Sequence, residues 1–110
     1  MTTATRSKKV SAEIRQLGRD IGLAAKAEKV ILFGSRARGQ AGDDSDVDIL
    51  VLTRNTRLRA LDIYRRIHKT LPLDLIVMTE SRFRTRLKAG DFFLMDIDEQ
   101  GVLLYARPGR

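Results

Sequence analysis

The sequence predicts an α+β domain that has a single small mixed β-sheet with helices packed on one face. Three observations support this fold class. Short apolar runs of strand length occur between longer segments in which apolar residues recur every three to four positions. The length of 110 residues suits one domain with a modest core. The chain contains no internal repeat or low-complexity tract, so we expect a single domain over residues 1–110, with residues 1–6 flexible.

The first expected element is a helix from about Ser7 to Lys26. Its apolar residues fall on one face at helical spacing: Val10, Ile14, Leu17, Ile21 and Ala25. A strand is expected at Lys29–Phe33, because apolar residues stand together there and lead into a glycine. We expect a short helix at Ser35–Arg38, then a loop at Gly39–Ser45 with a turn at Gly42–Asp44.

The second half of the chain alternates strands and helices. A strand is expected at Asp46–Thr53, where an apolar run follows two aspartates. A helix at about Thr56–Thr70 follows, and Pro72 marks its exit. Its inward residues are expected among Leu58, Leu61, Tyr64 and Ile67. The remaining elements are a strand at Leu73–Thr79, helices at about Ser81–Lys88 and Asp91–Asp98, and a last strand after Gly101.

The apolar segment Phe92–Met95 admits two interpretations. A small domain needs its large apolar side chains inside, which favours a place in the core. The alternative is an apolar surface patch that faces a partner.

A glycine–serine pair stands at the end of the first strand. Gly34 has no Cβ, which lets phosphate oxygens approach backbone N–H groups, and Ser35 can donate its hydroxyl to a phosphate. Arg36 and Arg38 add positive charge beside this turn. The segment lacks both the Gly-Lys-Ser/Thr ending of a P-loop and the glycine spacing of a dinucleotide fingerprint. We therefore expect these four residues to bind the phosphates of a nucleotide.

Three aspartates form the candidate metal site and the candidate catalytic site. Asp46 and Asp48 are spaced by two on a strand, so their carboxylates project from one face. Asp74 opens an otherwise apolar strand, where a charge without a partner is costly. If the two strands are neighbours, the three carboxylates repel one another, and bound cations keep them charged. Hard oxygen ligands with positions left for phosphates suit Mg²⁺, and the third acid allows two ions.

The order of the motifs separates this site from other uses of Asp-x-Asp. In haloacid-dehalogenase-like phosphatases and nucleotide-sugar glycosyltransferases the apolar strand precedes the acids, whereas here it follows Asp48. A glycine turn before the acids and a further acid after them together indicate a site for Mg²⁺ and a nucleoside triphosphate.

Composition limits the classes of function. The chain has no cysteine, which excludes disulfides and zinc–thiolate sites and fits a cytoplasmic protein. No apolar stretch approaches the roughly 18 residues of a membrane span, so we expect no membrane partner. The net charge is +7, but the basic residues are spread along the chain without interleaved aromatic residues. A solvated helix surface is therefore favoured, and an acidic protein partner or nucleic acid stays open.

Residues Val30–Val51, which read VILFGSRARGQAGDDSDVDILV, resemble the signature of the DNA polymerase β-like nucleotidyltransferase superfamily. The likeness is to its branch of small single-domain proteins, the minimal nucleotidyltransferases, and it continues through the Asp74 strand and the ending Glu99–Tyr105. The resemblance implies the polymerase β-like nucleotidyltransferase fold. It also implies that the three aspartates hold two Mg²⁺ ions, that Gly34 and Ser35 position the phosphates, and that Arg36 or Arg38 neutralises the leaving group.

The same resemblance implies in-line transfer of a nucleoside monophosphate, with AMP from ATP favoured, to an acceptor hydroxyl. Small chains of this branch are similar to antitoxins that transfer AMP to a tyrosine of a HEPN-domain ribonuclease toxin. The sequence has no appended substrate domain, so we expect a partner protein to supply the hydroxyl. Two alternatives stay open: transfer to a small-molecule hydroxyl, and a nucleotide-binding or toxin-masking module without turnover.

Overall fold

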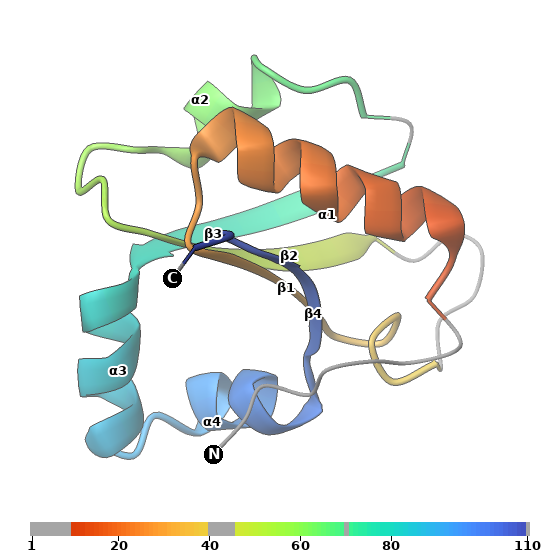
Figure 1. The fold of residues 1–110 in the computed structure, drawn as a ribbon. Helices are drawn as coiled ribbons and strands as arrows, with labels where there is room; N and C mark the ends of the chain where they lie inside the picture. Colours follow the sequence, from red (N-terminus) through yellow and green to blue (C-terminus); the bar gives the residue numbers. More distant parts are fainter. Residues whose placement is uncertain (1–9, 40–45, 70, 110) are drawn as a thin grey trace.

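The computed structural model describes residues 10–39, 46–69 and 71–109. Its elements are α1 (Ala12–Ala25), β1 (Lys29–Phe33), β2 (Val47–Thr53), α2 (Ala60–Tyr64), β3 (Leu73–Thr79), α3 (Glu80–Lys88), α4 (Phe92–Gln100) and β4 (Val102–Ala106). The strands form one sheet in the order β3-β2-β1-β4, in which β2 and β3 are parallel and the other neighbours are antiparallel (Figure 1). The predicted α+β fold with a small mixed sheet is confirmed. The expected turn at Gly42–Asp44 lies outside the described residues.

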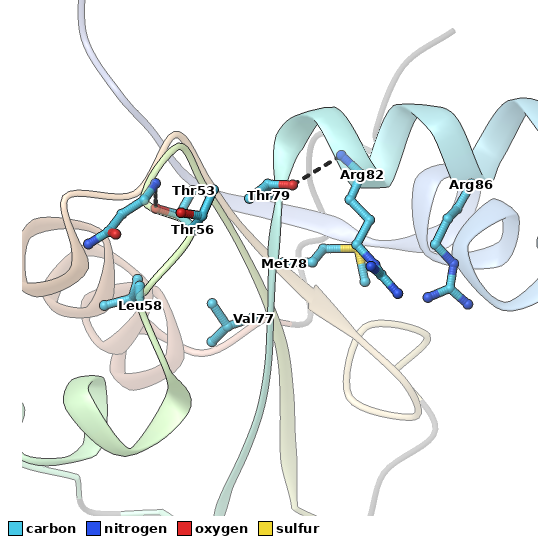
Figure 2. Close-up of a pocket in the computed structure, with 9 residues that line it drawn as sticks. Thr53, Thr56, Leu58, Val77, Met78, Thr79, Arg82 and Arg86 are labelled. Carbon is cyan, nitrogen blue, oxygen red and sulfur yellow. Dashed lines mark hydrogen bonds between the residues drawn. The ribbon is translucent and has the colours of Figure 1, made fainter.

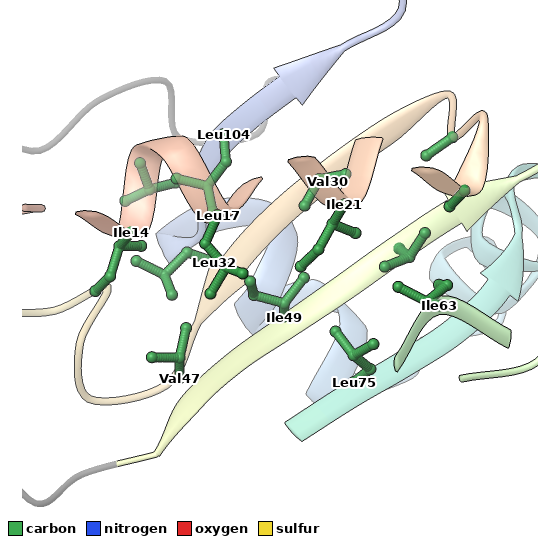
Figure 3. Packing of buried hydrophobic residues seen from close by; sticks show 14 of the residues in the cluster. Ile14, Leu17, Ile21, Val30, Leu32, Val47, Ile49, Ile63, Leu75 and Leu104 are labelled. Atoms are coloured by element: carbon green, nitrogen blue, oxygen red, sulfur yellow. The ribbon is translucent and has the colours of Figure 1, made fainter. Parts of the chain in front are cut away.

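Helices cover both faces of the sheet, so the expectation that they pack on one face was wrong. Figure 1 shows α1 and α2 on one side of the sheet and α3 and α4 on the other. Val30 and Leu32 belong to a core cluster with residues of α1 and α2, which Figure 3 shows, whereas Ile31 packs with residues of α3 and α4. Successive strand side chains point to opposite faces, so a strand that is apolar at every position needs cover on both.

The N-terminal helix begins at its capping serine. Ser11 accepts a hydrogen bond from the Ile14 N–H at 3.2 Å, which satisfies one of the free donors of the first turn. Lys26 ends the helix in the left-handed conformation, with a φ of 51°. The predicted inward residues are all buried: Val10, Ile14, Leu17, Ile21 and Ala25. The expected start at Ser7 lies outside the described residues.

Two glycines of α1 allow a close approach to β4. A Cβ at Gly18 would overlap the side chain of Leu104, and a Cβ at Gly22 would overlap the ring of Tyr105. The sequence gives no sign of this contact, because glycine in a helix interior otherwise only weakens the helix.

We expect Gly22→Ala to destabilise the protein. Alanine gains about 1 kcal/mol of helix propensity over glycine, but forcing a methyl group against the Tyr105 ring costs about 1–3 kcal/mol. Chemical denaturation should therefore show a lower free energy of unfolding. Leu23→Ala is the matched control, because Leu23 is 67% exposed on the same helix and its truncation should change stability by less than about 0.5 kcal/mol. A more stable Gly22→Ala variant would contradict the close packing of α1 on β4.

The helix predicted at Thr56–Thr70 is much shorter than expected. α2 covers only Ala60–Tyr64. Before it, the Asn55 N–H donates to Thr53 Oγ1 and the Arg57 N–H donates to Asn55 Oδ1, both at 2.9 Å. These side-chain bonds offer the backbone an alternative to the helix, which is why the segment after β2 forms turns.

The short helix presents a different face to the core from the one expected. Leu61 is 47% exposed, whereas Ile63 is completely buried. Leu58, Tyr64 and Ile67 do pack against the core as predicted. The Tyr64 hydroxyl donates to the Leu73 carbonyl at 2.9 Å and accepts from the Leu75 N–H at 3.2 Å, which fixes α2 against β3.

The placement of Phe92 and Phe93 in the core was also wrong. Asp91 caps α4 by accepting a hydrogen bond from the Leu94 N–H at 3.0 Å. This start places Leu94 and Ile97 inside, one turn apart, and leaves Phe92 85% and Phe93 52% exposed. The Phe93 ring meets Phe33 edge-on, with 5.6 Å between ring centroids.

Among the described residues, none of the helices has both the length and the apolar character that a membrane span requires.

Candidate active site

Two of the three candidate aspartates lie side by side at one end of the sheet. Asp48 of β2 is the register partner of Asp74 of β3. Register partners in neighbouring strands project from the same face, so the two carboxylates share one side of the sheet. It is the side covered by α3 and α4, because Leu50, two residues after Asp48, belongs to that core cluster.

Gly34 lies against the carboxylate of Asp48. Phe33 is the register partner of Asp48 across the antiparallel pair of β1 and β2, and Gly34 follows directly. Its φ of 79° lies in the left-handed region that favours glycine. A Cβ at Gly34 would lie 2.5 Å from Asp48 Oδ2. The missing side chain therefore makes the turn possible and also leaves room for the carboxylate.

The charges of two other aspartates act on the carboxyl of Asp48. Burial raises the pKa of the Asp48 carboxyl above its ordinary value, and the neighbouring charges of Asp74 and Asp46 raise this pKa further. Asp48 is partly buried, whereas Asp46 and Asp74 are exposed. Burial and repulsion both disfavour the ionised form of Asp48. A cation beside this carboxylate would offset the cost of burying its charge and its repulsion by the other two aspartates.

The donor set fits a magnesium ion that arrives with a nucleotide. Among the described residues, no three acidic, histidine or cysteine side chains are grouped closely enough to hold an ion on their own. Mg²⁺ at nucleotide sites takes one or two carboxylates and completes its shell with phosphate oxygens and water. The adjacent carboxylates of Asp48 and Asp74 match that requirement in type and number.

The residues after Gly34 form a turn and not the predicted short helix. The N–H groups of Ala37 and Arg38 both donate to the Gly34 carbonyl, at 3.1 and 3.3 Å. Gly39, with a φ of 72°, closes the turn. Ser35 is partly buried within it. The two left-handed glycines limit this segment to about one helical turn, which leaves its N–H groups at the end of the sheet that carries Asp48.

Arg38 makes a contact that the sequence did not suggest. Its Nη1 lies 3.6 Å from Asp96 Oδ2 of α4, with the two side chains 40% and 55% exposed. An ion pair this exposed adds little stability, but it holds the guanidinium between the turn and α4. A phosphate at the turn would compete with Asp96 for Arg38. The predicted phosphate-binding role of Arg36 and Arg38 stays a prediction.

A sizeable hollow in the described structure lies away from the three aspartates. It has a volume of about 600 Å³, and its lining includes Thr53, Thr79, Arg82 and Arg86 (Figure 2). Thr53 and Thr79 are five residues beyond Asp48 and Asp74 on their strands, which is roughly 16 Å at the usual strand rise. Arg86 is already paired with Asp91 at 2.8 Å. The hollow therefore belongs to the opposite end of β2 and β3 and contains none of the three aspartates.

The paired aspartates lie beside a glycine–serine turn on a mixed sheet, an arrangement that suits a nucleotide site. Comparison with known families agrees, because the family described as Polymerase beta, Nucleotidyltransferase matches residues 22–109. This match covers most of the chain, from within α1 to the residues after β4. The chain belongs to the polymerase beta nucleotidyltransferase family.

Individual relatives are consistent with this membership. A protein of Methanocaldococcus jannaschii, provisionally named a protein adenylyltransferase, is 46% identical over 43 residues, which cover 37% of this chain and 43% of that protein. The match thus spans less than half of the relative's length. A protein of Sulfolobus solfataricus with a crystal structure, provisionally named a nucleotidyltransferase, is 27% identical in sequence to this chain. The two structures superpose with a TM-score of 0.50 over 94% of this chain and 96% of that one.

A second solved structure shares the fold. It is a chain from a crystal structure of a toxin–antitoxin with AMP-PNP, with a TM-score of 0.54 and 19% identity. The likeness covers 89% of this chain and 76% of that chain. At this level of identity it demonstrates a common fold.

Proposed function

We propose that this chain is a Mg²⁺-dependent nucleotidyltransferase that moves AMP from ATP to a hydroxyl group of a partner protein. The observation that carries the proposal is the register pairing of Asp48 with Asp74. Their carboxylates share one face of the sheet, next to the turn at Gly34 and Ser35. A nucleoside triphosphate needs this combination, because its phosphates require both hydrogen-bond donors and a divalent cation.

Each site residue has a definite task in this proposal. Asp48 and Asp74, joined by Asp46 once a nucleotide is bound, would hold Mg²⁺, whose charge would offset that of the triphosphate. Backbone N–H groups and the Ser35 hydroxyl hold the β and γ phosphates in line for reaction. Arg36 or Arg38 offsets the charge that develops on the pyrophosphate.

The transfer step itself is a displacement at phosphorus. The acceptor oxygen forms a bond to the α-phosphorus while the bond from that phosphorus to the bridging oxygen of the β-phosphate breaks. Pyrophosphate leaves with the bridging oxygen. The proton of the acceptor hydroxyl passes to the carboxylate of Asp74, which is exposed and so can face an incoming partner.

Two likenesses support a protein acceptor. One relative is provisionally named a protein adenylyltransferase, and one structure with the same fold comes from a toxin–antitoxin with AMP-PNP. We propose that this chain is an antitoxin, and that its acceptor is a tyrosine of a HEPN-type ribonuclease toxin, as the family resemblance implies.

The test uses ATP radiolabelled at the α-phosphate, Mg²⁺ and the protein encoded by the neighbouring gene. We expect label on a tyrosine of that protein, located by mass spectrometry, and no label when EDTA is present. Label that appears on an added aminosugar without any protein partner would replace the proposal with a small-molecule activity. Nucleotide binding without any labelled product would indicate a binding module and would contradict catalysis.

A further inference from the structure

Strand β3 forms one edge of the sheet, and its backbone groups point alternately to two sides. It has β2 as its neighbour on one side and no strand of the described sheet on the other. The Val47 N–H of β2 donates to the carbonyl of Pro72, the residue just before β3, at 2.8 Å. Because the directions of N–H and C=O alternate along a strand, the even-numbered residues of β3 face β2 and the odd-numbered residues face outward.

The Tyr64 hydroxyl covers the beginning of this outer edge. It donates to the Leu73 carbonyl at 2.9 Å and accepts from the Leu75 N–H at 3.2 Å, which agrees with the outward direction of both residues. Further along, the Leu75 carbonyl and both backbone groups of Val77 have no hydrogen-bond partner among the described residues. Unpaired backbone groups in a row along an edge are a template for another strand.

The opposite edge of the sheet is less regular. The pairing of β4 with β1 shifts its register between Val30 and Ile31, which marks a β-bulge or a similar irregularity. Such irregularities twist an edge and hinder the addition of a strand. In contrast, β3 keeps one register with β2 from Leu73 to Thr79. The β3 edge is therefore the better template of the two.

The hollow of about 600 Å³ lies along this edge. Leu58 and Val77, which line it, pack with the core cluster on the side of α1 and α2, whereas Met78 packs with the cluster on the other side. Figure 2 shows Leu58 and Val77 on one side of β3, and Arg82 and Arg86 of α3 on the other. A hollow lined from both faces of a sheet lies beside its edge, so the outer backbone of β3 borders it.

The two walls of this groove differ in character. Arg82 is exposed, and no ion pair engages its side chain within the described ranges. Arg86 follows it by four residues, on the same face of α3, and is paired with Asp91. The wall formed by Leu58 and Val77 is apolar. The groove therefore presents one unpaired cation and one apolar surface on either side of a row of backbone groups.

We propose that an extended segment of a partner protein adds as a fifth strand along β3, between Leu75 and Thr79, and that its side chains alternate between acidic and apolar. Side chains of an added strand project to the two faces in turn, so the carboxylates would meet Arg82 and the apolar groups would meet Leu58 and Val77. Backbone hydrogen bonds to Leu75 and Val77 would supply affinity, and Arg82 would supply selectivity for acids.

A second copy of this chain fits the groove less well than an acidic partner does. Each copy has a net charge of +7, which opposes self-association. The β3 strand of a second copy would bring a single acid, Asp74, at its far end. The groove contains none of the three aspartates, so binding can be measured without nucleotide and its outcome is separate from that of the transfer reaction.

The first test uses the full chain and the heptapeptide Glu-Val-Glu-Val-Glu-Val-Glu with blocked ends. Amide hydrogen exchange is followed by NMR. We expect the outward-facing Val77 N–H to exchange about tenfold more slowly or more when the peptide is saturating. The Met78 N–H, which faces β2, is the internal control and should change far less. Unchanged exchange at Val77 with saturating peptide would overturn the proposal.

Arg82→Glu tests the charged wall. We expect this variant to bind the peptide about tenfold more weakly or worse, because attraction is replaced by repulsion. A glutamate in the first turn of α3 suits the helix dipole, so the fold should persist. Lys88→Glu changes the charge equally on an exposed residue of the same helix outside the groove, and it should bind like the wild type. Equal binding by the two variants would contradict a role of Arg82.

Two methylated peptides test the backbone pairing. The N–H groups of the Glu and Val residues project from opposite edges of the extended peptide. We therefore expect N-methylation of one set to abolish binding and N-methylation of the other set to be tolerated. Equal effects of the two would exclude strand addition. Val77 protection by a single-stranded oligouridylate and not by the peptide, or by dimerisation of the chain alone in sedimentation velocity, would assign the groove to RNA or to a second copy and overturn the proposal.

Discussion

Asp48→Asn is expected to reduce nucleotide transfer by about a thousandfold or more while leaving the fold intact. The substitution keeps the shape of the side chain but removes the charge that lies against the Gly34 turn and beside Asp74. Transfer is measured with α-labelled ATP and Mg²⁺, and circular dichroism checks the fold. Unchanged transfer in a folded variant would remove Asp48 from the active site.

The same variant should be more stable than the wild type when no metal is present. The raised pKa of Asp48 means that the folded state binds its proton more tightly than the unfolded state does. The wild type therefore loses stability as pH rises through the interval from the ordinary aspartate pKa to the raised one. Asp48→Asn avoids this loss, so its Tm in EDTA should exceed that of the wild type at neutral pH, and the difference should vanish in acid.

Asp62→Asn provides a control of opposite sign. Its hydrogen bonds with Arg59 lower the pKa of the Asp62 carboxyl. Asp62 therefore stabilises the protein above its ordinary pKa, and this contribution is lost as pH falls through the lowered pKa. Asp62→Asn should lower Tm at neutral pH. Shifts of the same direction in both variants would contradict the electrostatic account of the aspartate cluster.

Gly34→Ala is expected to abolish ATP binding and to destabilise the protein by about 1–3 kcal/mol. A side chain at a φ of 79° is strained, and the added Cβ would lie 2.5 Å from Asp48 Oδ2, so the turn or the carboxylate must move. Isothermal titration with Mg²⁺ and ATP measures the first effect, and chemical denaturation measures the second.

Gly90→Ala isolates the cost of the backbone alone. Gly90 has a similar φ of 87°, but a Cβ there would have no neighbour within 4 Å. We expect this variant to lose about 1 kcal/mol of stability and to bind ATP normally. If the two variants bound ATP equally well, the contact of Gly34 with Asp48 would have no role in the site.

The sequence was most informative where the relevant signal was local. Apolar runs located β1 and β3 at their observed bounds and β2 to within one residue. The sequence-based prediction failed for the helix after β2. There the side chains of Thr53 and Asn55 accept hydrogen bonds from the backbone, which compete with the helix, and the spacing of apolar residues does not reveal them. It also missed the link from Arg38 to Asp96, since nothing local couples two segments so far apart.

By itself the sequence determined the strands, the two-residue spacing of Asp46 and Asp48, and the glycine–serine turn before them. Each of these follows from backbone geometry over a few residues. Only the tertiary structure decided that β2 and β3 pair in parallel with Asp48 beside Asp74, and that helices cover both faces. Strand register and residue burial depend on segments that are distant in the chain. Both are set when apolar surfaces of several elements pack together and are removed from water.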